Sequence, residues 1–366
     1  MPPTDSFWRG KRVLLTGHTG FKGSWLSLWL SRLGARITGV ALPPATEPNL
    51  YHLAHVDKTL DSYYCDIRVE KALVPIARTA LPDIVFHLAA QPLVRASYRA
   101  PIDTLATNVM GTTHLLEALC GIESVRVIVV VTTDKVYKNI GASAAYREND
   151  PLGGHDPYSA SKAACEIVTE CYRASFFQPR GVAVATARAG NVLGGGDWSA
   201  DRLIPDAIRA WSSGHTLHVR RPNAVRPWQH VLEPLAGYMR LAEALWENPS
   251  LSGSYNFGPV AHEAATVREV VELARSAYGH GDVIYGSVSD GPHEEDSLRL
   301  EVDKARTVLG VIPKWPLAAA VERTMRWYRE QANAEDARTL CETDMQRYSR
   351  EGIWADVSPL ILRWAV

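Results

Sequence analysis

Tyr158 and Lys162 are the residues whose types and spacing most directly indicate chemistry. They begin and end the run YSASK, which opens a predicted helix, so both side chains fall on one helix face. A phenol ionises near ~10 and is a poor base at neutral pH, but a lysine beside it favours the phenolate and lowers that pKa. The pair therefore suits removal of a proton from an alcohol or sugar hydroxyl. Because the same spacing occurs by chance on many helices, the interpretation depends on the rest of the chain.

A second polar group follows the apolar run 125–131. This run is too short for a globular helix and rich in β-branched residues, which predicts a buried parallel strand. Thr133, Asp134 and Lys135 come directly after it. Ligands bind at the carboxyl ends of strands in open α/β sheets, so these side chains are expected beside the Tyr158 helix.

Gly17, Gly20 and Gly23 follow an apolar strand at 11–16 and lead into a helix over about 21–33. Glycines let the backbone approach a pyrophosphate, and a helix N-terminus presents free N–H groups to it. The order strand, glycine turn, helix therefore predicts a dinucleotide site.

The adenosine half of that site is less clearly defined. The second strand, 36–42, lacks the acidic residue that usually binds the ribose of NAD, and the next acid is Glu47. NAD and NADP both stay open on this point. Asp66 follows a third strand and is placed either to contact the adenine or to cap a helix. Ala89 follows the strand at 83–88 and leaves room for a cofactor.

The C-terminal part combines three arginines with aromatic residues in the run 220–230. Arginine forks match phosphate oxygens, and their planes can stack on a base. In a chain of nearly neutral charge, this favours a small nucleotide over nucleic acid. The segments 232–246, 254–257, 267–278 and 282–286 predict helices and short strands of a smaller lobe.

Composition excludes several classes of protein. The 366 residues carry 39 basic and 40 acidic side chains, a net charge of −1, without long single-sign blocks, which argues against nucleic-acid and anionic-membrane partners. Five cysteines without CxxC spacing favour a reducing compartment over disulfides or a zinc site. His293-Glu294-Glu295 has no second ligand group at metal-binding spacing, so no metal is expected. Without a signal peptide or a long apolar run, we expect a cytoplasmic protein.

These segments predict an α/β protein with a Rossmann-type doubly wound parallel sheet. The expected dinucleotide-binding domain covers 1–190, and 191–366 form mainly a C-terminal substrate lobe and tail, with some crossing of the chain between the lobes. The tail from Ala332 onward, with Trp354 and Trp364, is apolar enough to pack against the rest.

The strand–glycine turn–helix, the Tyr158/Lys162 pair and the loop at Asn191 resemble the extended short-chain dehydrogenase/reductase superfamily over about residues 11–330. The strings TGHTGFKGSWLSLWL, AAQPLVRASY, TTDKVY, GNVLGGGDW and RPWQHVLEPL are similar to the nucleotide-sugar 4,6-dehydratases that act on CDP-glucose. Most nucleotide-sugar 4,6-dehydratases carry Glu after the Asp, where this chain has Lys135.

The resemblance implies a reaction with NAD as a retained catalyst. Tyr158 would take the C4 hydroxyl proton as hydride leaves C4, with Thr133 holding that hydroxyl and Lys162 bonding the nicotinamide ribose. Asp134 would protonate the departing C6 hydroxyl. Lys135 would take the C5 proton, which requires its pKa to fall from ~10.4 towards neutrality. Hydride then returns to C6.

The resemblance also assigns binding residues and an assembly. The cofactor would contact Gly17, Gly20, Phe21, Gly23, Asp66, Ile67, Ala89, Asn108, Tyr158 and Lys162. The sugar nucleotide would contact Gln91, Asn191, Arg202 and Arg226. The product, CDP-4-keto-6-deoxyglucose, is a precursor of dideoxyhexoses in bacterial surface polysaccharide such as O-antigen. A homodimer or homotetramer would form through paired helices that include residues 163–172.

Three alternatives stay open. A dTDP-glucose 4,6-dehydratase or a UDP-sugar 4-epimerase would use the same scaffold, although an epimerase needs no acid and base for C5–C6 elimination. A nucleotide-binding regulatory protein without turnover is the non-enzymatic alternative, and the complete set of Thr133, Tyr158 and Lys162 argues against it.

Overall fold

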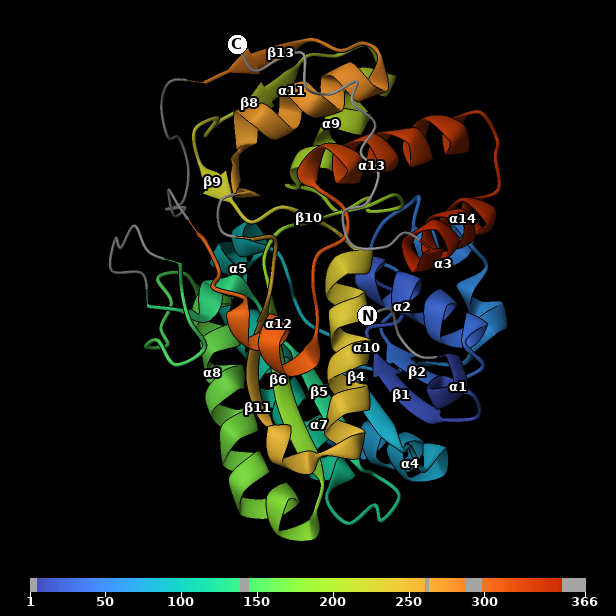
Figure 1. Ribbon diagram of the computed structural model, residues 1–366, viewed down its shortest axis with the longest axis vertical. Coiled ribbons are helices and arrows are strands. Elements are labelled where there is room, and N and C mark those ends of the chain that lie inside the picture. The colour runs from blue at the N-terminus through green and yellow to red at the C-terminus, as the bar shows by residue number, and fades with distance from the viewer. Residues whose placement is uncertain (1–4, 139–144, 261–262, 287–297, 351–366) are drawn as a thin grey trace.

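Seven parallel strands form the central sheet of the computed structural model, which describes residues 5–138, 145–260, 263–286 and 298–350 (Figure 1). Their spatial order is β11 (Gly253–Phe257), β6 (Ala183–Ala189), β5 (Val127–Val131), β4 (Ile84–His87), β1 (Arg12–Thr16), β2 (Arg36–Ala41) and β3 (Asp61–Tyr64). The chain moves outward from β1 in both directions, so the sheet has a switch point where ligands bind. The predicted Rossmann-type doubly wound sheet is confirmed.

The two faces of the sheet belong to separate cores. Leu14 and Val130 pack on one side, and Leu15 and Val129 pack on the other. The first face is covered by α4 (Glu70–Ala80), α7 (Gly111–Leu119) and α8 (Pro157–Tyr172). The second is covered by α2 (Phe21–Arg32) and α10 (Leu232–Glu247). All five residues of β5 are buried, which explains its unbroken apolar sequence.

The segment before α7 is helical but not one regular helix. It consists of α5 (Val94–Arg99), α6 (Pro101–Leu105) and a π-helical turn, η2 (Ala106–Met110), which leads directly into α7. The chain is therefore helical from Pro101 to Leu119, with a widened turn inside this segment.

The smaller lobe contains three short strand pairs and lies at the top of Figure 1. The pairs are β7 (Val192–Leu193) with β10 (Gln229–His230), β9 (Val225–Arg226) with β12 (Ala265–Thr266), and β8 (Leu217–Val219) with β13 (Val283–Tyr285). Its helices are α9 (Leu203–Ser212), α11 (Val267–Tyr278) and α13 (Leu317–Ala332).

Two expectations about this lobe are wrong. The helix predicted at 232–246 is α10, which covers a face of the main sheet. The strand predicted at 254–257 belongs to the main sheet, where β11 pairs with β6, and α10 and α12 (Asp303–Leu309) pack beside it. The sequence of a parallel edge strand does not reveal its partner, because that partner lies far away in the chain. The chain thus crosses between the lobes, while the domain boundary at residue 190 stays a prediction.

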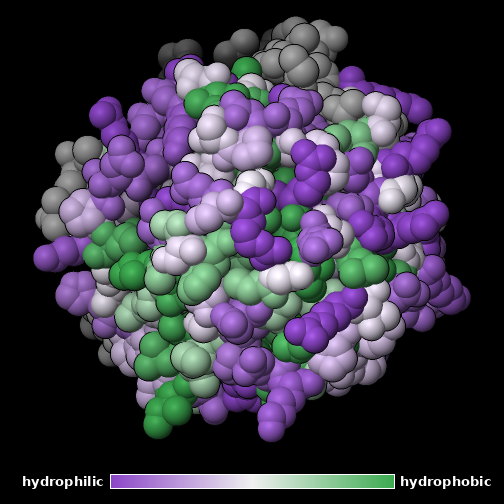
Figure 2. All heavy atoms as spheres, turned by 90° about the horizontal axis from the view of Figure 1, so that it is seen from below, coloured by the Kyte–Doolittle hydropathy of each residue, from purple (hydrophilic) through white to green (hydrophobic). Residues whose placement is uncertain are grey.

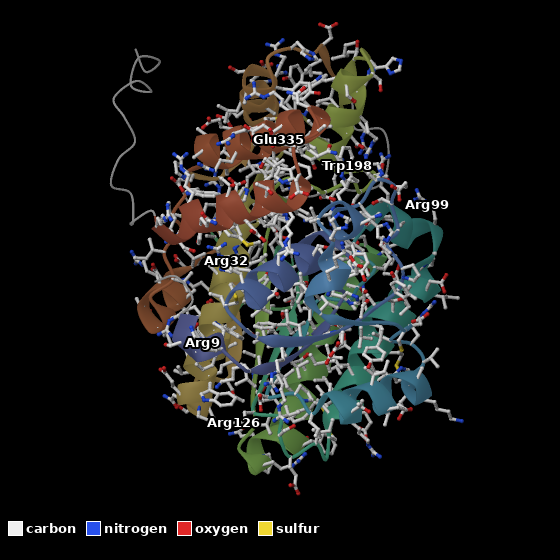
Figure 3. The ribbon with its side chains drawn as sticks, turned by 90° about the vertical axis from the view of Figure 1, so that its right-hand side faces the viewer. Arg9, Arg32, Arg99, Arg126, Trp198 and Glu335 are labelled. Atoms are coloured by element: carbon white, nitrogen blue, oxygen red, sulfur yellow. The ribbon has the colours of Figure 1, made fainter. Side chains whose placement is uncertain are left out.

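The C-terminal helix α14 (Ala337–Arg350) lies against α2 and α3 (Leu50–Leu53), on the side of the molecule seen in Figure 3. Tyr348 donates its hydroxyl to Glu233 Oε2 at 2.7 Å, which fixes α14 to the start of α10. At the other end of the chain, α1 (Asp5–Trp8) buries Trp8 in the core. Trp354, Trp364 and 293–295 lie outside the described residues. No helix in the described part of the chain is long and apolar enough to cross a bilayer.

Candidate active site

A cavity of about 810 Å³ separates the carboxyl ends of the strands from the smaller lobe. Most of the predicted site residues line it: Gly17, Gly20, Phe21, Gly23, Asp66, Ile67, Ala89, Thr133, Asp134, Lys135, Tyr158, Lys162, Asn191, Arg202 and Arg226. The structure therefore brings together residues from segments that are far apart in the sequence, between Gly17 and Arg226.

Gln91 and Asn108 are absent from that lining. Asn108 Oδ1 accepts from the Gln91 backbone N–H at 2.8 Å, and its Nδ2 donates to Ser161 Oγ at 2.8 Å. The Gln91 side chain bonds in turn to Leu93 and Thr104. These hydrogen bonds join the loop after β4 to α6, η2 and α8, and direct contact of Gln91 and Asn108 with a ligand stays a prediction.

The glycine turn between β1 and α2 fits a pyrophosphate. Gly17 has φ +80°, and a Cβ there would lie 2.7 Å from the Ala89 nitrogen. A Cβ at Gly23 would lie 2.0 Å from the Gly17 oxygen, whereas one at Gly20 would meet nothing closer than 3.4 Å. Gly20 caps α2 without a side-chain hydrogen bond, so the first-turn N–H groups remain available to an anion in the cavity.

Leu42 and Asp66 line the cavity at the predicted adenosine end of the dinucleotide site. Leu42 is 54% exposed at the end of β2, where an acidic ribose ligand usually lies. Arg68 NH2 lies 2.7 Å from Asp66 Oδ2, and its hydrogen bonds lower the Asp66 pKa. The alternative that Asp66 caps a helix is wrong, because α4 begins at Glu70 with Val69 as its N-cap. Its adenine contact stays a prediction.

The residues after β5 form a tight polar group. Thr133 caps a short 3₁₀ turn, η3 (Asp134–Val136), and its Oγ1 donates to Asp134 Oδ1 at 2.9 Å. Lys135 Nζ lies 3.4 Å from the same oxygen. Asp134 Oδ2 is buried without a hydrogen-bond partner among the described residues. That oxygen is available to a hydroxyl group of a ligand in the cavity.

Tyr158 is held at the start of α8. Asp156 caps this helix by accepting from the Ser159 N–H at 2.9 Å, and Pro157 occupies the first helical position. Burial raises the pKa of Tyr158 to about 12, while its hydrogen bond with Thr133 acts in the opposite direction.

The expected lowering of the Tyr158 pKa by Lys162 is not found. Lys162 Nζ donates to the Val131 carbonyl at 3.0 Å, and burial lowers the pKa of Lys162 itself. Of the basic side chains, Arg202 acts to lower the Tyr158 pKa. Sequence spacing placed Tyr158 and Lys162 on one helix face, but it could not show which group the ammonium contacts.

A buried network beneath the site holds α8 against the sheet. Glu166 Oε1 accepts from Thr132 Oγ1 at 2.5 Å, and its Oε2 accepts from Thr186 and Arg188 at 2.6 and 2.8 Å. The Arg188 guanidinium lowers the Glu166 pKa against the effect of burial. This network joins β5, β6 and α8, so the Thr133 and Tyr158 side chains extend from rigidly connected elements.

The sequence interpretation missed several charged residues of the cavity wall, among them Asp197 and Lys22. Asp197 is buried and accepts from Arg202 NH1 at 2.9 Å, and its backbone oxygen accepts from the Tyr328 hydroxyl at 2.5 Å. Lys22, inside the glycine turn, also lines the cavity. The sequence contained one feature that could have identified Lys22: a charged residue at the junction of the glycine turn and the apolar helix that follows it.

Comparisons with known proteins agree with this geometry. The model of the GDP-mannose 4,6 dehydratase family matches residues 14–324. The chain is 43% identical over 349 residues to a CDP-glucose 4,6-dehydratase of Salmonella typhimurium, covering 94% of this chain and 97% of the relative. It is 28% identical to a UDP-glucose 4-epimerase of Halalkalibacterium halodurans, covering 87% and 96%.

Among solved structures, a dTDP-glucose 4,6-dehydratase of Streptomyces venezuelae with NAD bound superposes with a TM-score of 0.76 at 27% identity, covering 88% of this chain and 98% of that one. MoeE5 with UDP-glucuronic acid and NAD gives a TM-score of 0.75 at 27% identity, covering 88% and 100%.

Proposed function

Because the chain belongs to the GDP-mannose 4,6-dehydratase family, we propose that it is an NAD-dependent hydro-lyase that converts CDP-D-glucose to CDP-4-keto-6-deoxy-D-glucose. The observation that carries this proposal is one cavity holding both Tyr158 with Thr133 and the Asp134/Lys135 pair. Oxidation at C4 needs one base, whereas elimination across C5–C6 needs an acid and a base. The 43% identical relative supports CDP-glucose as the substrate.

Bound NAD would supply reversible hydride transfer, from C4 and back to C6 of the sugar. Its pyrophosphate would lie on the first turn of α2, and Tyr158 would remove the C4 hydroxyl proton, with Thr133 orienting the hydroxyl. The Tyr158 pKa must fall from about 12 for this role. Arg202 supplies positive charge that favours the phenolate, and Lys162 would bond the nicotinamide ribose.

Asp134 and Lys135 would carry out the elimination. The free Oδ2 of Asp134 would deliver a proton to the C6 hydroxyl, which leaves as water. Lys135 would take the C5 proton and return it to C5 as hydride adds to C6. The 3.4 Å contact between the two side chains links proton uptake to proton donation. The product would serve dideoxyhexose formation for surface polysaccharide.

We also propose a homodimer formed through the face that contains α6 and α8. Figure 2 shows hydrophobic side chains gathered on the left of the view from below, the side on which α8 lies in Figure 1. The exposed apolar residues of α6, α8 and the segments that adjoin them are Tyr98, Ile102, Leu105, Met110, Ile167 and Phe176. Ile102 is 80% exposed and Ile167 is 61% exposed. The surface of a monomer rarely exposes so many large apolar side chains in one patch.

The experiment that tests the function is incubation of the purified protein and NAD with CDP-glucose, dTDP-glucose and UDP-glucose in parallel, scored by mass spectrometry. Loss of one water from CDP-glucose alone is the expected result. Turnover of dTDP-glucose alone would show that the enzyme prefers the thymine nucleotide to the cytosine nucleotide. An isomer of unchanged mass would indicate an epimerase, and no conversion of any sugar would favour a regulatory protein.

A further inference from the structure

An ion pair crosses the cavity from the side of the main sheet to the smaller lobe, and the proposed reaction does not use it. Arg95 Nη1, on α5, lies 3.4 Å from Asp201 Oδ1, in the loop before α9. Both side chains line the cavity, and they are 30% and 31% exposed. Ala200 and Asp201 are exposed residues of the same wall, so the pair lies where the cavity meets solvent. Arg99, at the end of α5, and Trp198, in the loop, lie close together on one side of the molecule (Figure 3).

The loop that carries Asp201 is held from behind by the smaller lobe. Arg209, on α9, donates to the backbone oxygens of Trp198 and Ser199 at 3.0 and 3.1 Å. Arg95 approaches the same loop from the opposite wall of the cavity. The loop would therefore stay with the smaller lobe when the ion pair opens, and the gap between the two walls would widen at that point.

Asp201 lies in an unfavourable local environment. Its φ is +60°, a left-handed conformation that aspartate tolerates better than most side chains but that is still uncommon. Burial raises the pKa of Asp206, on the first turn of α9, and the negative charge of Asp201 raises it further, so the two carboxylates repel each other. Asp206 pairs with Arg209, and Asp201 pairs with Arg95. When Arg95 withdraws, the loop loses the attraction that balances this repulsion.

The Arg95 side chain is held at its tip. Its Nε is buried and has no hydrogen-bond partner among the described residues, whereas its Nη1 contacts Asp201. An ion pair with this exposure shifts an equilibrium by up to about fivefold. Such a contact is strong enough to favour a closed cavity and weak enough to open in every catalytic cycle.

We propose that Arg95 and Asp201 form a latch that closes the rim of the cavity over the bound sugar nucleotide and slows its release. This inference rests on the proposed function, because the oxidised sugar must stay in the cavity until its hydride has been returned. Closure of a site by loops or lobes commonly commits a substrate in this way. Neither residue is proposed to act on the reacting atoms, so both are positioning residues.

A pulse–chase experiment measures release against chemistry. The protein with NAD is mixed for milliseconds with labelled CDP-glucose and then diluted into an excess of unlabelled CDP-glucose. The ratio of label converted to label released is determined after quenching. The variants are Arg95→Gln, Asp201→Asn and the two combined, since asparagine also tolerates a left-handed backbone. Arg99→Gln changes an exposed arginine of the same helix and is the control.

Both single variants should lower the ratio of converted to released label by about threefold to fivefold. The double variant should lower it no further, because the same ion pair is lost in all three proteins. Arg99→Gln should match the wild type. In about 1 M NaCl the wild type should approach the variants, since salt screens an exposed pair. A purely structural role would give additive losses in the double variant and no such convergence.

The effect of Asp201→Asn decides between a latch and simple attraction of the anionic substrate. If charge alone mattered, removing the carboxylate would retain label longer, while removing the Arg95 guanidinium would release it faster. Opposite effects would overturn the latch and would show that Arg95 binds the sugar nucleotide directly. Additive losses or unchanged ratios would overturn it too. If Arg95→Gln fails to fold, the direction of the change in Asp201→Asn still decides.

The same experiment separates this inference from the proposed function. If the wild type converts no labelled CDP-glucose, both the proposed function and the latch are overturned. If the wild type converts it normally and the variants show the wild-type ratio, the latch alone is removed.

Discussion

The two ends of the cavity are built in opposite ways. At the glycine turn the backbone forms the site, and side chains are excluded because a Cβ at Gly17 or Gly23 would collide with neighbouring backbone. At the end of β5 side chains form the site, and each polar atom of Thr133 and Asp134 has a specific environment. The glycine turn depends on the absence of side-chain atoms, whereas the end of β5 depends on the positions of charges and protons.

This difference sets what each end tolerates. A steric site loses its function when an atom is added, and charge-conserving changes nearby matter little. A proton-transfer site keeps its shape when a hydroxyl or an ammonium group is removed, yet loses the chemistry. Substitutions at the two ends should therefore separate binding from turnover, and the following predictions test that separation.

The largest effect is expected for Tyr158→Phe. Removing the hydroxyl removes the proposed base at C4 without changing the ring packing, so turnover of CDP-glucose should fall by about 10³-fold or more. Cofactor affinity should change little. Turnover would be measured by mass spectrometry of the product and cofactor binding by calorimetry. A variant that retains most of its activity would show that Tyr158 is not the base.

Lys135→Met should slow the elimination by about 10²-fold while leaving C4 oxidation intact. The reason is that Lys135 contacts Asp134, at 3.4 Å, whereas Tyr158 contacts Thr133. Rapid mixing with CDP-glucose should then show absorbance of the reduced cofactor accumulating at an early stage. Lys138→Met, a change to an exposed lysine beyond η3, is the control. An undiminished rate of water loss would remove Lys135 from the mechanism.

The sequence predicted the steric end of the site more completely than the charged end. Glycine spacing and the following helix determine a turn almost by themselves, and the described turn at Gly17 follows that prediction. The contacts of Lys162 with Val131 and of Asp197 with Arg202 depend on how distant segments pack, which local patterns do not contain. The placement of β11 failed for the same reason.

Gly17→Ala tests the steric end. Gly17 and Gly181 both have positive φ, +80° and +72°, so alanine is strained at each, but only at Gly17 would its Cβ collide with the Ala89 nitrogen at 2.7 Å. We expect Gly17→Ala to weaken NAD binding by about tenfold to a hundredfold, since the turn must shift, and to destabilise the fold by about 1–3 kcal/mol.

Gly181→Ala is the matched control, because nothing lies within 4 Å of its Cβ. It should lower the free energy of unfolding only by the backbone strain, about 1 kcal/mol, and leave NAD affinity unchanged. Calorimetric titration and urea unfolding would measure both quantities. Equal NAD affinity in the two variants would mean that the close packing of Gly17 on Ala89 does not shape the cofactor site.

Asp197→Asn is expected to give the smallest effect. It tests whether the charged end of the cavity also depends on a residue that does not itself take part in proton transfer. Asp197 is buried and pairs with Arg202, so losing its charge frees the guanidinium to take other conformations. The KM for CDP-glucose should rise by about tenfold, with kcat within a few-fold of wild type. Asp303→Asn breaks an exposed Asp–Arg pair on α12 and should change neither constant. If Asp197→Asn and Asp303→Asn have the same KM and kcat, the substrate lobe holds Arg202 without Asp197. The charged end of the cavity would then rely on packing alone, as the glycine turn does.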